Sequence, residues 1–239
     1  MMNYISSPYL NNKTHIKYNI RSFVCRYRSL TKKQKFALNN FWSCIGVEFQ
    51  RQSLNLTTLF HRKAFTVLEI GFGNGISLVA MAQQYPEKNF LGIEVYLPGV
   101  SRCLAAIRQA NITNLRIIHH DAIEVLEEMI SMQSLDMVQL FFPDPWHKTK
   151  HHKRRILQEV FAQQIKDKLK IGGCFHTATD SKNYAQHILT IMNSIPGYKN
   201  LSLDNTYVPR SNTRPLTKFE LLGQNLGHGH WELMFQRIL

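Results

Sequence analysis

The sequence lacks any apolar run that approaches the roughly 18–20 residues needed to cross a bilayer. Its first eight residues do not combine a basic segment with an apolar stretch, so we expect no signal peptide. No Cys-x-x-Cys pair is present, which argues against a zinc ribbon or a disulfide framework. We therefore expect free thiols in a reducing, cytoplasmic setting at all four cysteines: Cys25, Cys44, Cys103 and Cys174.

Acidic residues are missing from two segments that are rich in basic ones. Residues 1–47 hold eight Lys or Arg, and residues 147–155 hold five more. These segments account for the whole excess behind the formal net charge of +13, so the rest of the chain is balanced. A basic arm and a basic loop on a neutral body indicate a polyanionic partner, nucleic acid first and an anionic membrane second.

Length and composition fit one globular domain with an extension. The chain has 239 residues, of which 44% are hydrophobic and 19% charged, too few charges for a disordered chain. Residues 1–20 are polar and basic with little periodicity, and we expect a mobile arm there. From Leu30 to Phe49 the apolar residues follow the buried stripe of a helix. We predict a basic, partly flexible arm and helix over 1–47 and one main domain over 48–239.

From residue 66 onward, short apolar segments alternate with longer helical ones. The expected strands are 67–70, 90–95, 115–119, 137–142 and 174–178, and the expected helices are 76–84, 98–110, 122–132 and 155–169. This alternation predicts a parallel sheet with helices on both faces. Segments 201–203 and 231–238 are further strand candidates that could complete an edge. The fold class is α/β, doubly wound and Rossmann-like, with a basic N-terminal extension.

Ligands bind to such sheets beyond the carboxyl ends of the strands. A turn with Gly71, Gly73 and Gly75 follows the first strand, and its spacing departs from the G-x-G-x-x-G of dinucleotide binders. Glu94 ends the second strand, where a carboxylate can accept hydrogen bonds from ribose hydroxyls. Asp121 follows the third strand, where it can accept from an adenine amino group.

Glu69 immediately precedes the glycine turn and distinguishes between cofactors. Its charge would repel a diphosphate and attract a sulfonium that carries an α-ammonium group. The alternative is that these acids are merely solvated at loop starts. The combination favours S-adenosyl-L-methionine over NAD.

After the fourth strand the chain reads Phe141-Phe142-Pro143-Asp144-Pro145-Trp146. Two prolines fix the backbone around one aspartate and hold its carboxylate at the strand tip. Amino-methylating enzymes of this fold carry Asp/Asn-Pro-Pro-aromatic at this point, a motif from which Asp-Pro-Trp departs. The basic run 148–155 follows at once. Charge runs usually form a solvated face, but the position beside Asp144 favours a phosphate-binding loop.

Five segments match one known family: 68–73, 92–95, 141–147, 153–155 and 213–220. Phe-Phe-Pro-Asp-Pro-Trp and Arg-Pro-x-Thr-Lys-Phe-Glu are highly specific together. From about residue 21 to its end, the chain resembles the bacterial tRNA (guanine-N7)-methyltransferases, which have the class I methyltransferase fold. The first 20 residues do not match.

The resemblance implies transfer of a methyl group from S-adenosyl-L-methionine to N7 of a guanine in the tRNA variable loop, at position 46. It implies a methyl-donor site formed by Glu69, Gly71, Gly73, Glu94, Asp121 and Asp144, with Asp144 as the catalytic residue. The substrate guanosine would contact Lys148, Asp180, Thr217, Lys218, Phe219 and Glu220. The tRNA backbone would meet Lys150, His151, Lys153, Arg154 and Arg155.

The chemistry of guanine agrees with these assignments. N7 carries an in-plane lone pair and no proton, so its methylation needs positioning and a fixed negative field rather than a general base. Asp144 can supply that field, while Asp180 and Glu220 can accept hydrogen bonds from N1–H and N2–H₂. Asp180 could instead cap a helix, and Glu220 could be a solvated loop acid.

Two pairs of histidines have short spacings, His147 with His151 and His228 with His230. Neither pair belongs to an H-E-x-x-H motif, and methyl transfer to N7 requires no metal, so we predict none. A monomer is favoured over a homodimer. Two other classes remain open: an RNA-binding protein with a vestigial cofactor fold, and an NAD-dependent oxidoreductase, which Glu69 and Ile76 disfavour.

Overall fold

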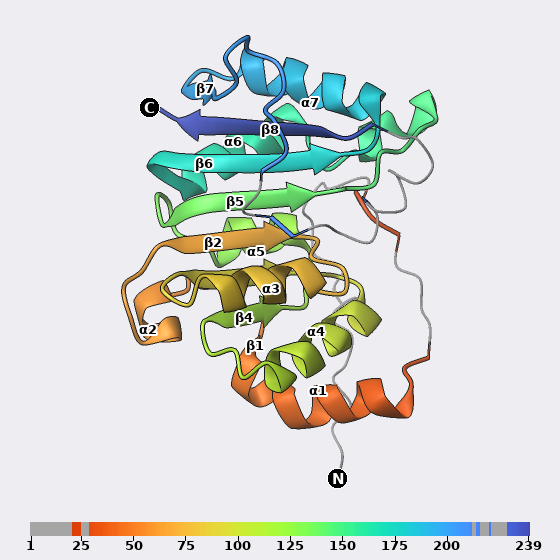
Figure 1. Cartoon of the computed structure of the whole chain (residues 1–239), viewed down its shortest axis with the longest axis vertical. Helices are drawn as coiled ribbons and strands as arrows, with labels where there is room; N and C mark the ends of the chain where they lie inside the picture. Colours follow the sequence, from red (N-terminus) through yellow and green to blue (C-terminus); the bar gives the residue numbers. More distant parts are fainter. Residues whose placement is uncertain (1–20, 25–28, 212–213, 216–219, 221–228) are drawn as a thin grey trace.

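The computed structural model describes residues 21–24, 29–211, 214–215, 220 and 229–239. Within them the chain forms an eight-stranded sheet (Figure 1). All pairings are parallel except those that β8 makes with β6 and β7. In sheet order the strands are β1 (Gly46–Val47), β4 (Leu115–Ile118), β3 (Asn89–Ile93), β2 (Thr66–Ile70), β5 (Leu135–Phe141), β6 (Leu169–Thr179), β8 (Trp231–Arg237) and β7 (Tyr198–Asn200).

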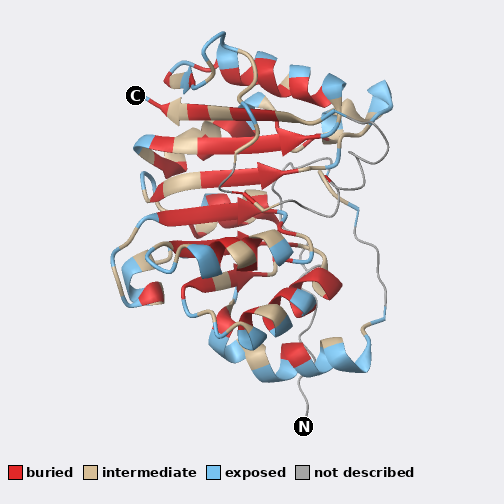
Figure 2. Ribbon diagram, viewed as in Figure 1, coloured by how far each residue is buried: buried red, intermediate tan, exposed pale blue. Residues whose placement is uncertain are grey.

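Helices cover both faces of the sheet, as the α/β alternation predicts. One core lies under α1 (Lys32–Ile45), α3 (Ile76–Gln84) and α4 (Leu97–Gln109), and the other under α5 (Ala122–Glu128), α6 (Glu159–Lys168) and α7 (Lys182–Ser194). Within β2, Val67 joins the first core, whereas Leu68 and Ile70 join the second. Every residue of β2 and β3 is buried, which explains why these strands are mostly apolar and makes the burial of Glu69 within β2 unusual (Figure 2).

The five predicted strands correspond to β2 through β6, and the predicted helix 76–84 is α3. The helix predicted from residue 155 begins later, at Glu159. Residues Thr149–Arg154 form a separate 3₁₀ helix, η1, which ends at its capping residue Arg155. The basic run therefore forms its own short element beyond β5 and does not lead directly into α6.

The C-terminal part differs from the prediction at both strand candidates. Segment 201–203 is not a strand, because Asp204 Oδ1 accepts hydrogen bonds from the hydroxyls of Ser202 (3.0 Å) and Thr206 (2.7 Å) and closes a turn there. The preceding β7 forms the sheet edge instead. β8 is a strand, but it lies between β6 and β7 and does not complete an edge.

The predicted N-terminal helix packs against the helices and strands that follow it. α1 begins at a capping box in which Thr31 and Gln34 bond reciprocally through side chain and backbone. The helix packs on α4, and β1 directly after it pairs in parallel with β4. The boundary predicted at residue 47 therefore separates elements that pack together. The predicted arm, residues 1–20, lies outside the described residues.

Two sequence-distant segments meet at the carboxyl edge of the sheet. The connections from β2 to β3 and from β5 to β6 run toward opposite edges of the sheet, so the loops after the neighbouring strands β2 and β5 diverge and leave room for a crevice. The short segment Arg21–Val24 reaches the same edge, where Trp146 Nε1 donates a 3.1 Å hydrogen bond to the carbonyl of Ser22. In the part of the chain described, no helix is long and apolar enough to cross a membrane.

Candidate active site

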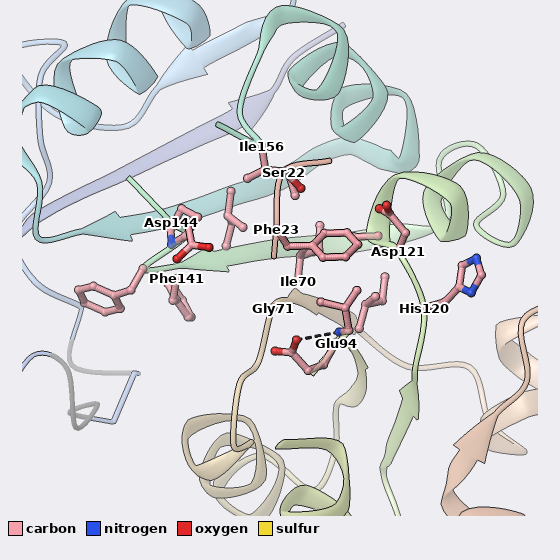
Figure 3. Close-up of a pocket in the computed structure, with 16 residues that line it drawn as sticks. Ser22, Phe23, Ile70, Gly71, Glu94, His120, Asp121, Phe141, Asp144 and Ile156 are labelled. Atoms are coloured by element: carbon pink, nitrogen blue, oxygen red, sulfur yellow. Dashed lines mark hydrogen bonds between the residues drawn. The ribbon is translucent and has the colours of Figure 1, made fainter. Parts of the chain in front are cut away.

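A cavity of about 220 Å³ opens at this crevice (Figure 3). Residues that follow β2, β3, β4 and β5 line it, and Ser22 and Phe23 form a further part of its wall. The ring of Phe23 lies in the middle of the view, with Asp144 to one side and Asp121 to the other (Figure 3). The cavity therefore brings together Glu94, Asp121 and Asp144, which sequence reasoning placed at separate strand ends, whereas Glu69 lies buried in β2 and is not part of its lining.

The glycine turn after β2 presents bare backbone to this cavity. Gly71 has φ +73°, and a side chain there would meet no described atom within 4 Å. Gly75, also at φ +73°, has no such freedom, because a Cβ atom would lie 2.3 Å from Cys103 Sγ. Gly75 is thus required both for its backbone conformation and for close packing against Cys103. Near Gly71, in contrast, there is open space that a ligand could fill. Ile76 replaces the third glycine of a dinucleotide site and starts α3.

Glu94, directly after β3, is fixed by three backbone donors. Its Oε1 accepts from the N–H groups of Val95 (2.7 Å) and Tyr96 (2.8 Å), and its Oε2 accepts from Gly73 (2.7 Å). Burial raises the pKa of Glu94, these N–H groups oppose the rise, and the charge of Asp144 adds to it. Glu94 therefore orients the glycine turn and keeps lone pairs that ribose hydroxyls could use.

Glu69 is a buried carboxylate close to the cavity, and the described residues do not fill all of its hydrogen-bonding capacity. It is 4% exposed, and its Oε2 atom has no hydrogen-bond partner among them. Burial and the charge of Glu94 raise its pKa to about 8, partly opposed by Arg214. An orphaned buried carboxylate beside an open glycine turn fits a cationic ligand such as a sulfonium with an α-ammonium group.

Asp121 both caps a helix and lines the cavity. Its Oδ1 accepts from Ile123 N (3.0 Å) and caps α5, and the residue also lines the cavity. Burial raises its pKa, and Arg21 is among the charges that lower it. One Asp121 oxygen is therefore used by the helix, and the carboxylate still borders the predicted adenine site.

Asp144 lies on a backbone held in an unusual conformation. The residues that flank its Pro-Asp-Pro core, Phe142 (φ +49°) and Trp146 (φ +47°), both occupy the left-handed region. Bulky side chains are rare in that region, and such strain persists where the surroundings fix it. Phe142 N donates to Ala178 O at 2.8 Å, which ties the turn to β6. The exposed Asp144 lines the cavity at its mouth.

The basic loop extends from this mouth into solvent. Lys148, Lys150 and Lys153 are exposed, and the guanidinium of Arg154 stacks on the Trp146 ring at 4.1 Å from its centroid. The pKa of His151 is lowered, by desolvation first and then by the neighbouring lysines and Arg154. The loop thus concentrates positive charge next to Asp144.

Arg155 does not share this outward placement. It is buried, and it donates from Nε to the carbonyl of Pro145 (3.0 Å) and from Nη2 to Asn183 Oδ1 (2.5 Å). Its guanidinium also packs on the Tyr184 ring. Contrary to the predicted phosphate contact, the side chain is committed to holding the loop against α7.

The predicted guanosine contacts are only partly described. Asp180 is exposed just after β6 and does not cap α7, because Ser181 is the capping residue. Thr217, Lys218 and Phe219 lie outside the described residues. Glu220 is not a solvated loop acid: it is 3% exposed and forms a bidentate ion pair with Arg214, at 2.5 and 2.6 Å. Its carboxylate is thus directed at the arginine in this arrangement.

Sequence reasoning gave no role to two groups that the structure places at the site. Ser22 and Phe23 carry no motif, and nothing in their sequence signals a cavity wall. Arg214 stands inside the matched segment 213–220, which is the only signal that could have identified it. Of the histidine pairs, His228 is not described, and within the described ranges no three His, Cys, Asp or Glu side chains cluster as a metal site would require.

Residues 63–233 match the family described as "Putative methyltransferase". The tRNA (guanine-N(7)-)-methyltransferase of Edwardsiella ictaluri is 64% identical over 219 residues, 92% of each chain. That of Serratia proteamaculans is 58% identical over 237 residues, 99% of each chain. Among solved structures, the 16S rRNA methyltransferase KamB is 13% identical and superposes with a TM-score of 0.57, over 81% of this chain and 97% of its own, which shows a shared fold.

The fold predicted from the sequence, a class I methyltransferase sheet, is thus confirmed. The resemblance drawn from the five segments is confirmed as well. On the match to the family and the near full-length identity to its curated members, this chain belongs to the tRNA (guanine-N7)-methyltransferase family.

Proposed function

We propose that this protein transfers a methyl group from S-adenosyl-L-methionine to N7 of a guanine in tRNA, at variable-loop position 46. The observation that carries the proposal is the placement of Asp144 between the donor cavity and the acid-free basic loop. A polyanionic substrate held by that loop would present a base at the cavity mouth. Relatives 58–64% identical are named tRNA (guanine-N(7)-)-methyltransferases, which supports methyl transfer to guanine N7 in tRNA. A tRNA substrate in turn supports a cytoplasmic setting for the reaction.

Residues around the cavity fit the methyl donor. The donor supplies a methyl group on a positively charged sulfur. Glu69 would hold its cationic amino-acid end, Glu94 its ribose hydroxyls and Asp121 its adenine amino group. The open backbone at Gly71 lets the donor approach the turn closely.

The reaction moves one positive charge and no proton. The N7 lone pair forms a bond to the methyl carbon as the carbon–sulfur bond breaks and its electron pair stays on sulfur. The purine gains the charge that the sulfonium loses. Asp144 at the cavity mouth would stabilise the cation that develops on the base, and fixed charge needs no rearrangement during the step.

The most direct experiment is mass spectrometry of tRNA nucleosides after incubation with the protein and S-adenosyl-L-methionine. We expect 7-methylguanosine, and fragment mapping should place it in the variable loop. Methylation at another atom, or at another tRNA position, would contradict the corresponding part of the proposal.

Two other functions make different predictions. An NAD-dependent oxidoreductase would bind NAD in calorimetry, whereas we expect heat from S-adenosyl-L-methionine and none from NAD, because Ile76 replaces the third glycine of a dinucleotide site and Glu69 offers a diphosphate no positive partner. A non-catalytic RNA-binding protein would bind tRNA and transfer no methyl group. The preserved Glu69, Glu94, Asp121 and Asp144 favour a working site over a vestigial one.

The tRNA affinity should fall steeply with salt. Lys148, Lys150 and Lys153 are exposed beside the cavity, and each phosphate contact releases about one counterion. A triple variant with these lysines changed to alanine should lower the slope of log Kd against log salt by about three. Fluorescence anisotropy with labelled tRNA at several salt concentrations measures this slope.

Lys63→Ala serves as the matched control. Lys63 is exposed just before β2, at the opposite end of the strands, so its loss should leave the slope unchanged. Equal slopes for the triple variant and the native protein would rule out the loop as the phosphate-binding element.

A further inference from the structure

Arg214 is a buried cation that binds three separate parts of the fold. It is 1% exposed. Its Nη1 and Nη2 atoms donate to both Glu220 oxygens, and Nη2 also donates to Glu232 Oε2 on β8 at 3.0 Å. Burial disfavours its charge, but the hydrogen bonds and charges of the two glutamates outweigh burial and raise its pKa. The guanidinium is therefore charged and fixed in a planar fork.

Glu232 connects this arginine to the centre of the sheet. Its Oε1 lies 2.5 Å from His176 Nε2 on β6 and accepts a 3.0 Å hydrogen bond from Ser211 N. The ring of His176 packs edge-on against Phe141, with centroids 5.0 Å apart. A continuous set of contacts thus leads from the C-terminal segment to the last residue of β5.

Arg214 also directly contacts the turn that carries Asp144, the proposed catalytic residue (residues 141–146, the catalytic turn). Its guanidinium lies 5.0 Å from the centroid of the Phe141 ring and 5.5 Å from that of Phe142. Phe142 is the residue at φ +49°, two positions before Asp144. A strained aromatic residue keeps such a conformation only when its side chain is fixed, and Arg214 contacts that side chain.

Stability alone gives little reason for this arrangement. A buried ion pair often adds nothing over an apolar packing of similar volume, because desolvation offsets the attraction. Its ability to fix the groups around it explains the arrangement better, because the planar guanidinium can hold two carboxylates and two aromatic rings in one geometry. The charge of Arg214 also acts on Glu69 at the donor site.

We propose that Arg214 is the positioning residue of the catalytic turn: it fixes the Phe141–Phe142 rings, and through them Asp144, and it ties the turn to the C-terminal segment through Glu220. The inference rests on the proposed function, since Asp144 acts there on the guanine. Arg214 itself touches no reacting atom. Glu220, bound to the same guanidinium, takes part in this positioning.

Arg214→Lys tests this role, because lysine keeps the charge but loses the fork and the planar stacking. With a displaced Asp144, we expect the single-turnover rate of tRNA methylation to fall at least about 10-fold, while the Kd for S-adenosyl-L-methionine changes less than about threefold. Single-turnover rates at saturating tRNA count only folded, cofactor-loaded enzyme, so partial unfolding does not imitate the effect. An unchanged rate would overturn the proposal.

A double-mutant cycle separates positioning from general disruption. If Arg214 acts through the Phe142 ring, Arg214→Lys should cost less than about threefold in a Phe142→Leu background. The same loss in both backgrounds would also refute the idea. Arg237→Lys is the control: Arg237 is buried too, but it bonds main-chain carbonyls of Lys166 and Leu169 at the other end of β8, so its loss should leave the rate intact.

These outcomes are distinguishable from failure of the proposed function. If the native protein forms no 7-methylguanosine in tRNA, the function itself is wrong. If the native protein forms it and Arg214→Lys forms it equally fast, only the positioning role fails.

Discussion

An Asp144→Asn variant should bind tRNA as the native protein does and yet transfer methyl groups on the order of 10²–10³-fold more slowly. Asparagine has nearly the same shape as aspartate, so the Pro-Asp-Pro turn should keep its backbone. What disappears is the negative charge at the cavity mouth, where the purine becomes cationic. Radiolabelled methyl transfer under single-turnover conditions measures the loss.

The affinity for S-adenosyl-L-methionine should change much less than the rate in this variant. Asp144 is exposed, and its charge adds to the raised pKa of Glu94, so removing it should make Glu94 easier to ionise. A rate loss that saturating cofactor restores would assign Asp144 to donor binding alone.

Asp204→Asn is a suitable control for that experiment. Asp204 is an exposed aspartate in the turn after β7, where Ser202 and Thr206 donate to it. It lies outside the cavity wall, so its replacement should leave methyl transfer unchanged. Full activity of Asp144→Asn would contradict electrostatic stabilisation by this residue.

Local sequence could place the acids of the proposed donor site because each stands at or near the carboxyl end of a strand. Glu69, Glu94 and Asp121 stand at strand ends, and parallel strands end at a common edge, so one rule of topology brings all three together. The same rule placed Asp144 at the tip of β5. For these residues the regular βα repeat makes position in the sequence a guide to proximity in space.

Contacts between distant segments could not be predicted in this way. Arg214 meets Phe141 across 73 sequence positions, and Ser22 meets Trp146 across 124, with no periodic pattern that relates the partners. The orientation of Arg155 within the basic run could not be predicted from the sequence either. Its composition predicted positive charge beside Asp144, but only packing against Asn183 and Tyr184 shows that Arg155 points inward.

Replacing Glu69 by glutamine should raise the stability of the cofactor-free protein and weaken its binding of S-adenosyl-L-methionine. The pKa of Glu69 is about 8 in the folded protein against an ordinary 4.5. Below pH 4.5 the group is protonated in both states, so it does not affect stability. Between pH 4.5 and 8 the unfolded chain has lost this proton while the folded protein still holds it, so stability falls progressively as the pH rises to 8 and levels off above it.

Glu69→Gln removes this ionisable group and keeps its shape. The cofactor-free variant should exceed the native protein in stability by on the order of 3 kcal/mol at pH 8, about 5–10 °C in Tm, and by little at pH 5. Thermal unfolding of both proteins across this pH range measures the difference. Glu87→Gln, at an exposed site between α3 and β3, should show no such pH-dependent gain.

The same substitution should weaken binding of S-adenosyl-L-methionine about 10- to 100-fold, because a buried cation loses its charged partner. Binding of the cationic cofactor to the native protein should ionise Glu69 and release close to one proton at pH 7. Calorimetry in two buffers with different ionisation enthalpies measures that release, and Glu69→Gln should lack it. If the variant binds the cofactor with native affinity and native proton release, Glu69 does not face the cation, and the orphaned carboxylate needs another explanation.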